Sequence, residues 1–385
     1  MSPRFLEGNR LTLLRNGAEY FPALENSIRN ARHEIYLETY LYEDDATGQR
    51  VTDALCEAAR RGVRVHVLVD GFGAKDMPQP LRARLLEAQV RFLVFRPNIS
   101  LRLRRHRLRR MHRKVAVTDG RVAFVGGINV IDDTNTPDHA PPRYDYAVLV
   151  EGPLVRPIHA EVEKLWRLVS WVNLRRRRKP GQGIALEDAP KGDQRAALVI
   201  RDNFHHRSDI EDAYLEAFAS AREEIILANA YFFPGKRFRR ALVQAARRGV
   251  RVVLLLQGRV EFILLHFASR ALYGMLLDAG IELHEYHKGF MHAKVAVIDG
   301  HWATVGSSNI DPFSLMLARE ANLVVEDRKF AADLRDSLQA ALANGAAVMP
   351  KKKWSRKPLW QRTVIWSAYG VVRFLMGMVG YGGGY

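Results

Sequence analysis

Two stretches of the sequence match each other: MHRKVAVTDG at residues 111–120 and MHAKVAVIDG at residues 291–300. Each is followed, at the same distance, by a glycine-containing segment, VGGIN at residues 125–129 and VGSSN at residues 305–309. The histidine, lysine, aspartate, glycine and asparagine positions coincide in the two copies. This agreement indicates one structural unit that the chain contains twice.

The apolar Val-Ala-Val run after each lysine predicts a β-strand. Residues two apart on a strand lie on one face, so His112 and Lys114 should point the same way, as should His292 and Lys294. A single copy is more often a strand with an incidental histidine and a lysine whose stem lies along apolar surface. Two copies with identical spacing favour a phosphate site with a nucleophile beside it.

Donors for a phosphate follow both strands. Glycine turns expose backbone N–H groups, and each copy then adds a side-chain amide or hydroxyl. The candidate phosphate-binding residues are Asn129, Asn309 and Ser307.

These residues resemble the signature of the phospholipase D superfamily, His-x-Lys-x4-Asp followed by x6-Gly-Ser-x-Asn and carried twice. The first copy differs at Gly127, where the superfamily usually has serine. Within the superfamily the chain resembles the bacterial cardiolipin synthases, most closely the B type, over nearly all of residues 4–350. Further stretches that carry this likeness are residues 7–9, 110–114, 145–153, 229–234 and 301–309.

The resemblance implies a phosphatidyltransferase with phosphatidylglycerol as its substrate. A phosphatidyl group would pass from one phosphatidylglycerol to another through a phosphohistidine, giving cardiolipin and glycerol, with no cofactor. A phospholipase D-type hydrolase and a nuclease of the same superfamily are the alternatives.

The residue types themselves suit phosphodiester chemistry. One neutral histidine can attack phosphorus while the other protonates the leaving oxygen; we expect His112 to be the nucleophile and His292 the acid. Lys114, Lys294 and the two asparagines would hold the phosphoryl oxygens, which Mg²⁺ does in other enzymes. We therefore expect no metal.

Carboxylates complete the predicted site. Each imidazole needs one to fix its tautomer, and the candidates are Glu320 in the second half, where the superfamily places it, and Asp145 in the first. Asp119 and Asp299 belong to the catalytic signature. Their odd offset from the histidines directs them to the opposite strand face, so we expect a structural role for both.

A second repeat divides the chain into two halves. Residues 58–65 and 245–252 both read AARRGVRV, each between a helical pattern and an apolar strand. We predict an α/β fold with two similar phospholipase D-like domains, residues 1–171 and 197–350, each a mixed sheet flanked by helices. A basic linker at residues 172–196 would join them. Equivalent halves most simply pack about a pseudo-two-fold axis, with the active site at their interface, as the resemblance also implies.

Composition limits the partners and the compartment. The net charge of +17 predicts attraction to a polyanion, which can be nucleic acid or an anionic membrane. The single cysteine, Cys56, excludes an internal disulfide and suits a reducing compartment. The N-terminus lacks the apolar run of a signal peptide. We expect a peripheral protein on the cytoplasmic side of the inner membrane that does not bind nucleic acid.

Three further segments bear on the substrate. The arginine-rich residues 96–114 are either a solvated loop or a collar for lipid phosphates. Residues 261–279 predict an apolar helix, which either lies in the core or borders an acyl-chain groove. The tail, residues 351–385, is basic and then apolar. It is too short to cross a bilayer, which takes about 20 apolar residues, so it should lie in the membrane interface or pack on the body.

Overall fold

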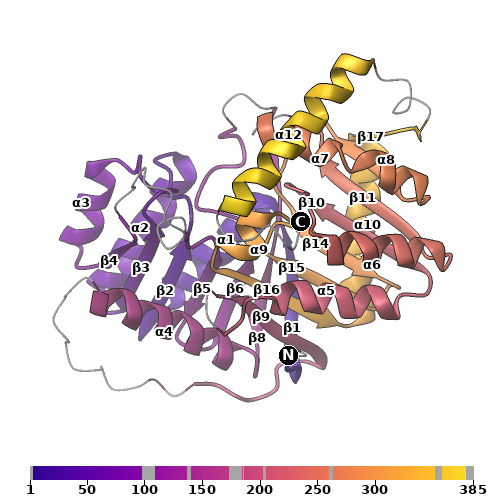
Figure 1. Ribbon diagram of the computed structural model, residues 1–385. Coiled ribbons are helices and arrows are strands. Elements are labelled where there is room, and N and C mark those ends of the chain that lie inside the picture. The colour runs from indigo at the N-terminus through magenta and orange to yellow at the C-terminus, as the bar shows by residue number, and fades with distance from the viewer. Residues whose placement is uncertain are drawn as a thin grey trace.

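The computed structural model describes residues 3–97, 109–136, 140–172, 184, 186–202, 205–259, 263–351 and 358–378. A single mixed sheet runs through both halves of the protein (Figure 1). Its first-half strands are β1 (Leu6–Arg15), β2 (Glu34–Thr39), β3 (Arg64–Asp70), β4 (Arg91–Phe95), β5 (Lys114–Thr118), β6 (Val122–Gly126) and β8 (Tyr146–Glu151). Its second-half strands are β9 (Gln194–Arg201), β10 (Glu224–Asn229), β11 (Arg251–Gln257), β12 (Glu282–Tyr286), β14 (Lys294–Ile298), β15 (Trp302–Gly306), β16 (Glu320–Glu326) and β17 (Ala346–Val348).

The strand order repeats outward from the centre of the sheet. The first half runs β1-β8-β6-β5-β2-β3-β4, and the second runs β9-β16-β15-β14-β10-β11-β12 with β17 at the edge. β1 pairs antiparallel with β9, so the two halves share one sheet. The predicted fold class, two similar α/β halves with a mixed sheet flanked by helices, is confirmed, and β5 and β14 occupy equivalent positions.

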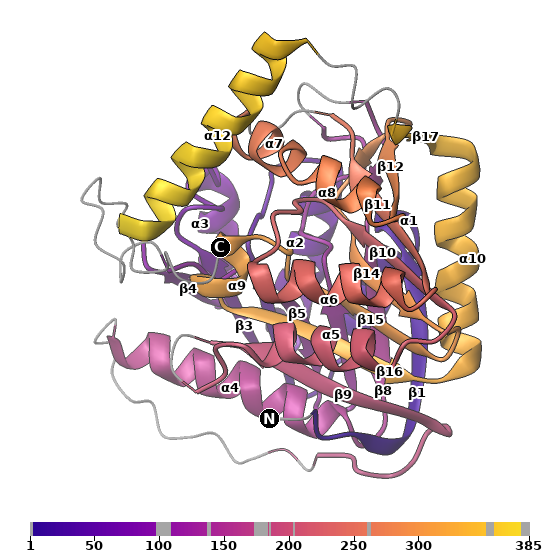
Figure 2. The same ribbon diagram turned by 45° about the vertical axis from the view of Figure 1, so that its right-hand side comes forward.

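Helices cover both faces of the sheet (Figure 2). The central core cluster spans the two halves and lies under α4 and α10, whereas each half has a separate cluster beneath its other helices. The first-half helices are α1 (Asn16–Asn30), α2 (Ala46–Arg60), α3 (Gln79–Glu87) and α4 (Val155–Val172). The second-half helices are α5 (Asp209–Ser220), α6 (Lys236–Arg247), α7 (Ile263–Arg270), α8 (Tyr273–Asp278), α9 (Pro312–Met316), α10 (Arg328–Gly345) and α12 (Leu359–Met378).

The AARRGVRV repeat ends a helix and begins a strand in both halves. Gly62 and Gly249 each have φ of +91°, the left-handed conformation in which a glycine terminates a helix without strain. Between the halves, α4 ends at Val172 and β9 begins at Gln194. Most of the predicted linker, residues 173–183 and 185, lies outside the described residues.

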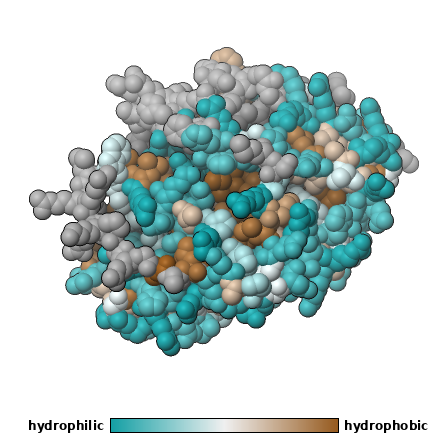
Figure 3. Space-filling view, turned by 90° about the horizontal axis from the view of Figure 1, so that it is seen from below, coloured by the Kyte–Doolittle hydropathy of each residue, from teal (hydrophilic) through white to brown (hydrophobic). Residues whose placement is uncertain are grey.

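One helical segment differs from the expectation, because two helices form where the sequence predicted one. Residues 263–278 form α7 and α8 with a break at residues 271–272, because backbone turns end α7 there. In the tail, α12 packs along α7 through Ile365, Ala368 and Val372, so one face of it lies against the body. Within the described part of the chain, no helix has the length and apolarity needed to cross a membrane. Seen from below, the surface is mainly hydrophilic with separate apolar patches (Figure 3).

Candidate active site

The two histidines lie immediately before the equivalent strands β5 and β14. The backbone N–H of His112 donates to the carbonyl of Arg319 at 2.9 Å, and that of His292 donates to the carbonyl of Tyr144 at 2.8 Å. β13 (Phe290–Met291) pairs in parallel with β7 (Arg143–Tyr144) in the same way. Each histidine segment is therefore bonded to the other half of the chain, just before that half's candidate carboxylate.

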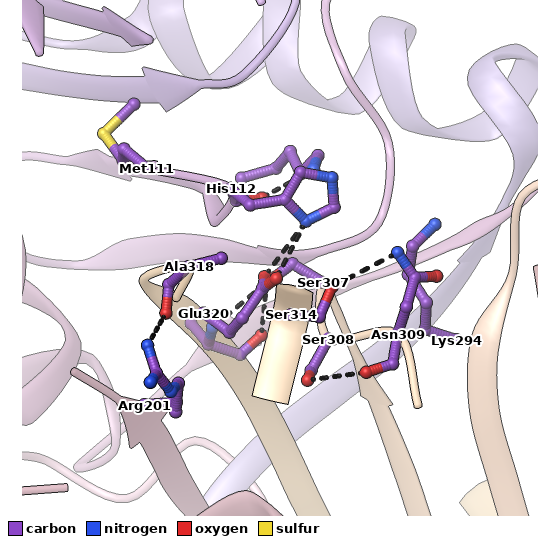
Figure 4. Close-up of polar contacts among 12 residues, drawn as sticks. Met111, His112, Arg201, Lys294, Ser307, Ser308, Asn309, Ser314, Ala318 and Glu320 are labelled. Carbon is purple, nitrogen blue, oxygen red and sulfur yellow. Dashed lines mark hydrogen bonds and ion pairs between the residues drawn. The ribbon is translucent and has the colours of Figure 1, made fainter. Parts of the chain in front are cut away.

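The side chains pair across the halves as well, and Figure 4 shows the pair of His112 with Glu320. Nδ1 of His112 lies 3.0 Å from Oε1 and 3.2 Å from Oε2 of Glu320. Nδ1 of His292 lies 2.6 Å from Oδ2 of Asp145. A carboxylate that accepts from Nδ1–H leaves Nε2 as the reactive nitrogen. The sequence identified one carboxylate in each half but did not indicate that each would reach the histidine of the other half.

Burial keeps both imidazoles neutral. It lowers the pKa of His112, and it lowers the pKa of His292 well below the ordinary value with help from the charges of Lys294 and Lys114. The charge of a protonated His112 would lower the pKa of His292 as well. Burial raises the pKa of Asp145 to about 6. A neutral imidazole is the form that can act as a nucleophile.

The two lysines lie beside their histidines. Nζ of Lys114 donates to the backbone carbonyl of His112 at 2.5 Å, and burial lowers the pKa of Lys114 to about 7. Lys294 is fully buried; its Nζ donates to the carbonyl of His292 and lies 3.6 Å from Oδ2 of Asp145. Both ammonium groups therefore lie next to the histidine and carboxylate pairs.

The two asparagines have different environments. Oδ1 of Asn129 accepts from the backbone N–H of Leu41 at 3.0 Å, which leaves its Nδ2 as a donor. Nδ2 of Asn309 lies 3.5 Å from Oγ of Ser314, and its Oδ1 has no partner among the described residues. Both side chains are buried.

The sequence predicted that Ser307 binds phosphate, whereas in the structure its side chain binds a carboxylate. Its hydroxyl is fully buried and donates to Oε2 of Glu320 at 2.5 Å, so it holds the carboxylate that lies against Nδ1 of His112. At the matching position, a Cβ added to Gly127 would lie 2.3 Å from Oδ1 of Asp145. The Asp145 carboxylate thus fills the space that a serine would need there. In the first copy, Gly127 and Asp145 therefore go together: the glycine leaves room for the carboxylate, and the carboxylate leaves no room for a serine.

Asp119 and Asp299 follow the ends of β5 and β14 and bind backbone. Asp119 accepts from the N–H groups of Arg32, His33 and Glu34 at 2.8 to 2.9 Å. Asp299 accepts from those of Arg222, Glu223 and Glu224 at the same distances. Each aspartate closes the turn that leads into a neighbouring strand, β2 or β10.

Several residues at the site carry no signal in the sequence motifs. The ring centroid of Tyr40 lies 4.9 Å from that of His112, and the ring of Phe290 stacks on His292 at 6.1 Å. Oδ2 of Asp70 accepts from the backbone N–H of Met111 at 2.8 Å and so fixes the segment before His112. Phe290 lies two residues before His292 in the sequence. Tyr40 and Asp70 are distant in sequence from His112, and only the fold places them beside it or beside Met111.

Two further kinds of binding group are an arginine-rich collar for lipid phosphates and a set of metal ligands. Of the arginine-rich segment 96–114, residues 98–108 lie outside the described residues, and Nη1 of Arg110 lies 3.9 Å from Oδ1 of Asp70. Among the described residues, no group of three histidine, cysteine or acidic side chains is arranged to hold a metal ion.

Comparison with known proteins gives both sequence and fold relatives. A family model described as cardiolipin synthase, PLD-like domain, matches residues 24–166 and 214–342. Cardiolipin synthase B of Salmonella typhimurium is 41% identical over 97% of this chain and 90% of its own length. Cardiolipin synthase B of Escherichia coli K12 is 40% identical with the same coverage of both chains. The crystal structure of phosphatidylserine synthase from Haemophilus influenzae superposes with a TM-score of 0.71 at 12% identity, over 98% of this chain and 96% of that one.

Proposed function

This chain belongs to the family of phospholipase D-like cardiolipin synthases, and we propose that its two cross-paired histidines transfer a phosphatidyl group from one phosphatidylglycerol to a second. The observation that carries the proposal is the pair of dyads, His112 with Glu320 and His292 with Asp145. Each dyad takes one residue from each half. Only the assembled protein has two oriented imidazoles available for one phosphorus.

The first step forms a covalent intermediate. Nε2 of His112 attacks the phosphorus of the donor lipid, the P–N bond forms, and the P–O bond to the glycerol headgroup breaks. The leaving oxygen takes a proton from Nε2 of His292. The bound anionic phosphodiester favours the charged form of His292, so Nε2 takes up a proton from water when the donor lipid binds and passes that proton to the leaving oxygen. The ammonium groups of Lys114 and Lys294 stabilise the charge on the phosphoryl oxygens.

The second step reverses the proton transfer. The now neutral His292 takes the proton from a hydroxyl of the acceptor phosphatidylglycerol, whose oxygen attacks phosphorus as the P–N bond breaks. Cardiolipin leaves and both rings return to their starting states. The carboxylates of Glu320 and Asp145 keep Nδ1 protonated in both steps.

We assign the membrane contact to α12, on the cytoplasmic side of the inner membrane. Trp360, Trp366 and Phe374 are 67%, 56% and 67% exposed on the face of α12 that points away from α7. Aromatic side chains on a helix surface suit the headgroup region of a bilayer. The net charge of +17 supports attraction to anionic lipid.

A product assay tests the proposed reaction. Purified protein is incubated with labelled phosphatidylglycerol vesicles and, in parallel, with plasmid DNA. We expect cardiolipin and free glycerol from wild-type protein, no turnover from His112→Ala or His292→Ala, and acid-labile phosphate trapped on His112. Phosphatidic acid as the sole lipid product would assign a hydrolase instead. DNA nicking without any lipid product would assign a nuclease.

A further inference from the structure

A buried ion pair lies directly behind the first catalytic histidine. Arg113 stands between His112 and Lys114 in the sequence and is 3% exposed. Its Nη2 donates to Oε1 of Glu38 at 2.8 Å, and its Nε donates to Oε2 of the same carboxylate. Glu38 lies on β2 and is 2% exposed. Because neighbouring side chains of an extended segment point to opposite faces, the pair points away from the phosphate site.

The second half has no ion pair at the matching positions. Ala228 takes the place of Glu38, because the two residues are aligned with equivalent valines of β14 and β5. Ala293 takes the place of Arg113 in the repeated motif. Both alanines are fully buried, so the same strand pairing forms there without a charge. The duplicated fold therefore does not itself require the ion pair.

Stability is a weak explanation for the pair. Burial raises the pKa of Glu38, because its charge is unfavourable in the interior, and the charge of Arg113 acts against that rise. An apolar pair of similar volume in such a place is often as stable as the ion pair, or more stable. An arginine that donates through two nitrogens to one carboxylate does fix the geometry of both side chains. The segment whose position the pair fixes is therefore the feature to consider.

Arg113 connects the segment of the first histidine to three other parts of the fold. Its guanidinium binds β2 through the ion pair, and its Nη2 also donates to the backbone carbonyl of Glu161 in α4 at 3.0 Å. Its backbone N–H donates at 3.0 Å to the carbonyl of Arg319, which also accepts from the N–H of His112. Arg319 directly precedes Glu320, the carboxylate partner of His112. The contacts of Arg113 thus fix His112 relative to its own partner.

The residue after the second histidine makes no such side-chain contacts. The backbone N–H of His292 donates to the carbonyl of Tyr144, but Ala293 has no polar side-chain group. The two catalytic tasks differ in the precision that they need. A nucleophile must lie in line with phosphorus, and a misplacement of about 1 Å can lower the rate about 10²-fold. An acid can deliver its proton through one water molecule.

We infer that Arg113 and Glu38 are positioning residues that hold His112 in line with the phosphorus, and that the half with this pair is the half in which the phosphohistidine forms. The inference rests on the proposed transferase function. It assigns the nucleophile from a structural difference between two otherwise equivalent halves. Both residues act through His112 and not through contact with the lipid.

The first test separates positioning from stability. Arg113→Met leaves Glu38 buried without its partner and should lower the melting temperature. Adding Glu38→Leu removes both charges and should restore most of the melting temperature. We expect the double variant to release glycerol about 10²-fold more slowly than wild type in a single turnover, because His112 is no longer fixed. Recovery of the rate together with the stability would overturn the positioning role.

A second donor lipid identifies the step that the pair serves. The phosphatidyl ester of p-nitrophenol has a leaving group that departs without a proton from His292. The double variant should be slowed as much with this donor as with phosphatidylglycerol, since the attack by His112 is impaired. Release of nitrophenolate measures the rate. If the defect disappears with this donor, the pair serves the acid step and the assignment of His112 is wrong.

Two further variants complete the test. Arg113→Lys keeps the charge but cannot donate in the same fork, so it should release glycerol about tenfold more slowly with little change in melting temperature. This variant decides the question if the double variant does not fold. The matched control is Arg251→Met with Glu282→Leu, a pair that also joins neighbouring strands through two nitrogens, at the first residues of β11 and β12. The control should keep the wild-type rate.

The outcomes distinguish the inference from the proposed function. Wild-type protein that releases no glycerol and makes no cardiolipin overturns the proposed function itself. Active wild type, with glycerol release unchanged in Arg113→Lys and in the folded double variant, overturns only the positioning role.

Discussion

The carboxylate of Glu320 lies 3.0 Å from Nδ1 of His112, although the two residues are 208 positions apart and belong to different halves of the chain. Asp145 and His292 repeat the relationship in the opposite direction. Neither half contains a complete dyad of its own. Both dyads therefore depend on the two halves together, which are joined by the sheet contact between β1 and β9, by the pairing of β13 with β7 and by the shared core.

The first prediction concerns this cross-half contact. Glu320→Gln keeps the shape of the side chain but can present its amide to Nδ1, which favours the wrong tautomer of His112. We expect the rate of cardiolipin formation to fall about 10³-fold with little change in melting temperature. Glu326→Gln at the far end of the same strand is the control and should retain activity. A Glu320→Gln enzyme with wild-type turnover would show that the dyad does not orient His112.

The second prediction concerns Gly127 and Asp145. Gly127→Ser places a side chain in the space of the Asp145 carboxylate, since the added Cβ would lie 2.3 Å from Oδ1. We expect turnover to fall about 10²-fold because displaced Asp145 no longer orients His292. Adding Asp145→Glu reproduces the serine and glutamate of the second half and should restore most of the activity. No recovery in the double variant would mean that the two positions are not coupled.

The third prediction concerns pH. Burial raises the pKa of Asp145 to about 6 and lowers that of Lys114 to about 7. Below about pH 6 Asp145 is protonated and cannot accept from His292, and above about pH 7 Lys114 loses its charge. The rate on detergent-dispersed phosphatidylglycerol should therefore rise and then fall over this range. Lys114→Arg keeps its charge at all these pH values and should remove the alkaline decline in whatever activity remains. An alkaline decline that persists in this variant would belong to another group.

The fourth prediction separates stability from chemistry. Asp119→Asn retains one acceptor oxygen but loses the charge that binds three backbone N–H groups. We expect the free energy of unfolding to fall by about 1–3 kcal/mol, while the folded fraction keeps most of its turnover. Denaturant unfolding and the lipid assay measure the two effects. Asp299→Asn should behave in the same way, and loss of turnover without loss of stability in either variant would instead indicate a catalytic role.

The fifth prediction concerns the two faces of α12. Trp366→Gln and Phe374→Gln change exposed side chains, so each should weaken binding to anionic vesicles about tenfold without lowering the melting temperature. Val372→Gln introduces an amide on the face buried in the core and should lower the melting temperature. If the exposed variants bind vesicles as wild type does, α12 is not the membrane contact.

The sequence by itself determined the repeated unit and the local structure around it. A period of two predicted the strands that begin at Lys114 and Lys294, although His112 and His292 lie just before them, and the AARRGVRV repeat marked a helix end and a strand start in each half. Such patterns are local, because the periodicity of a strand and the conformation of a glycine depend on a few neighbouring residues. The duplicated α/β fold follows from them.

Only the tertiary structure decided which groups meet. The spacing in the chain identified Glu320 and Asp145 but could not say which histidine each would reach, since that depends on how β1 and β9 join the halves. The burial of Ser307 against Glu320 and the packing of Asp145 into the space at Gly127 are likewise contacts between distant segments.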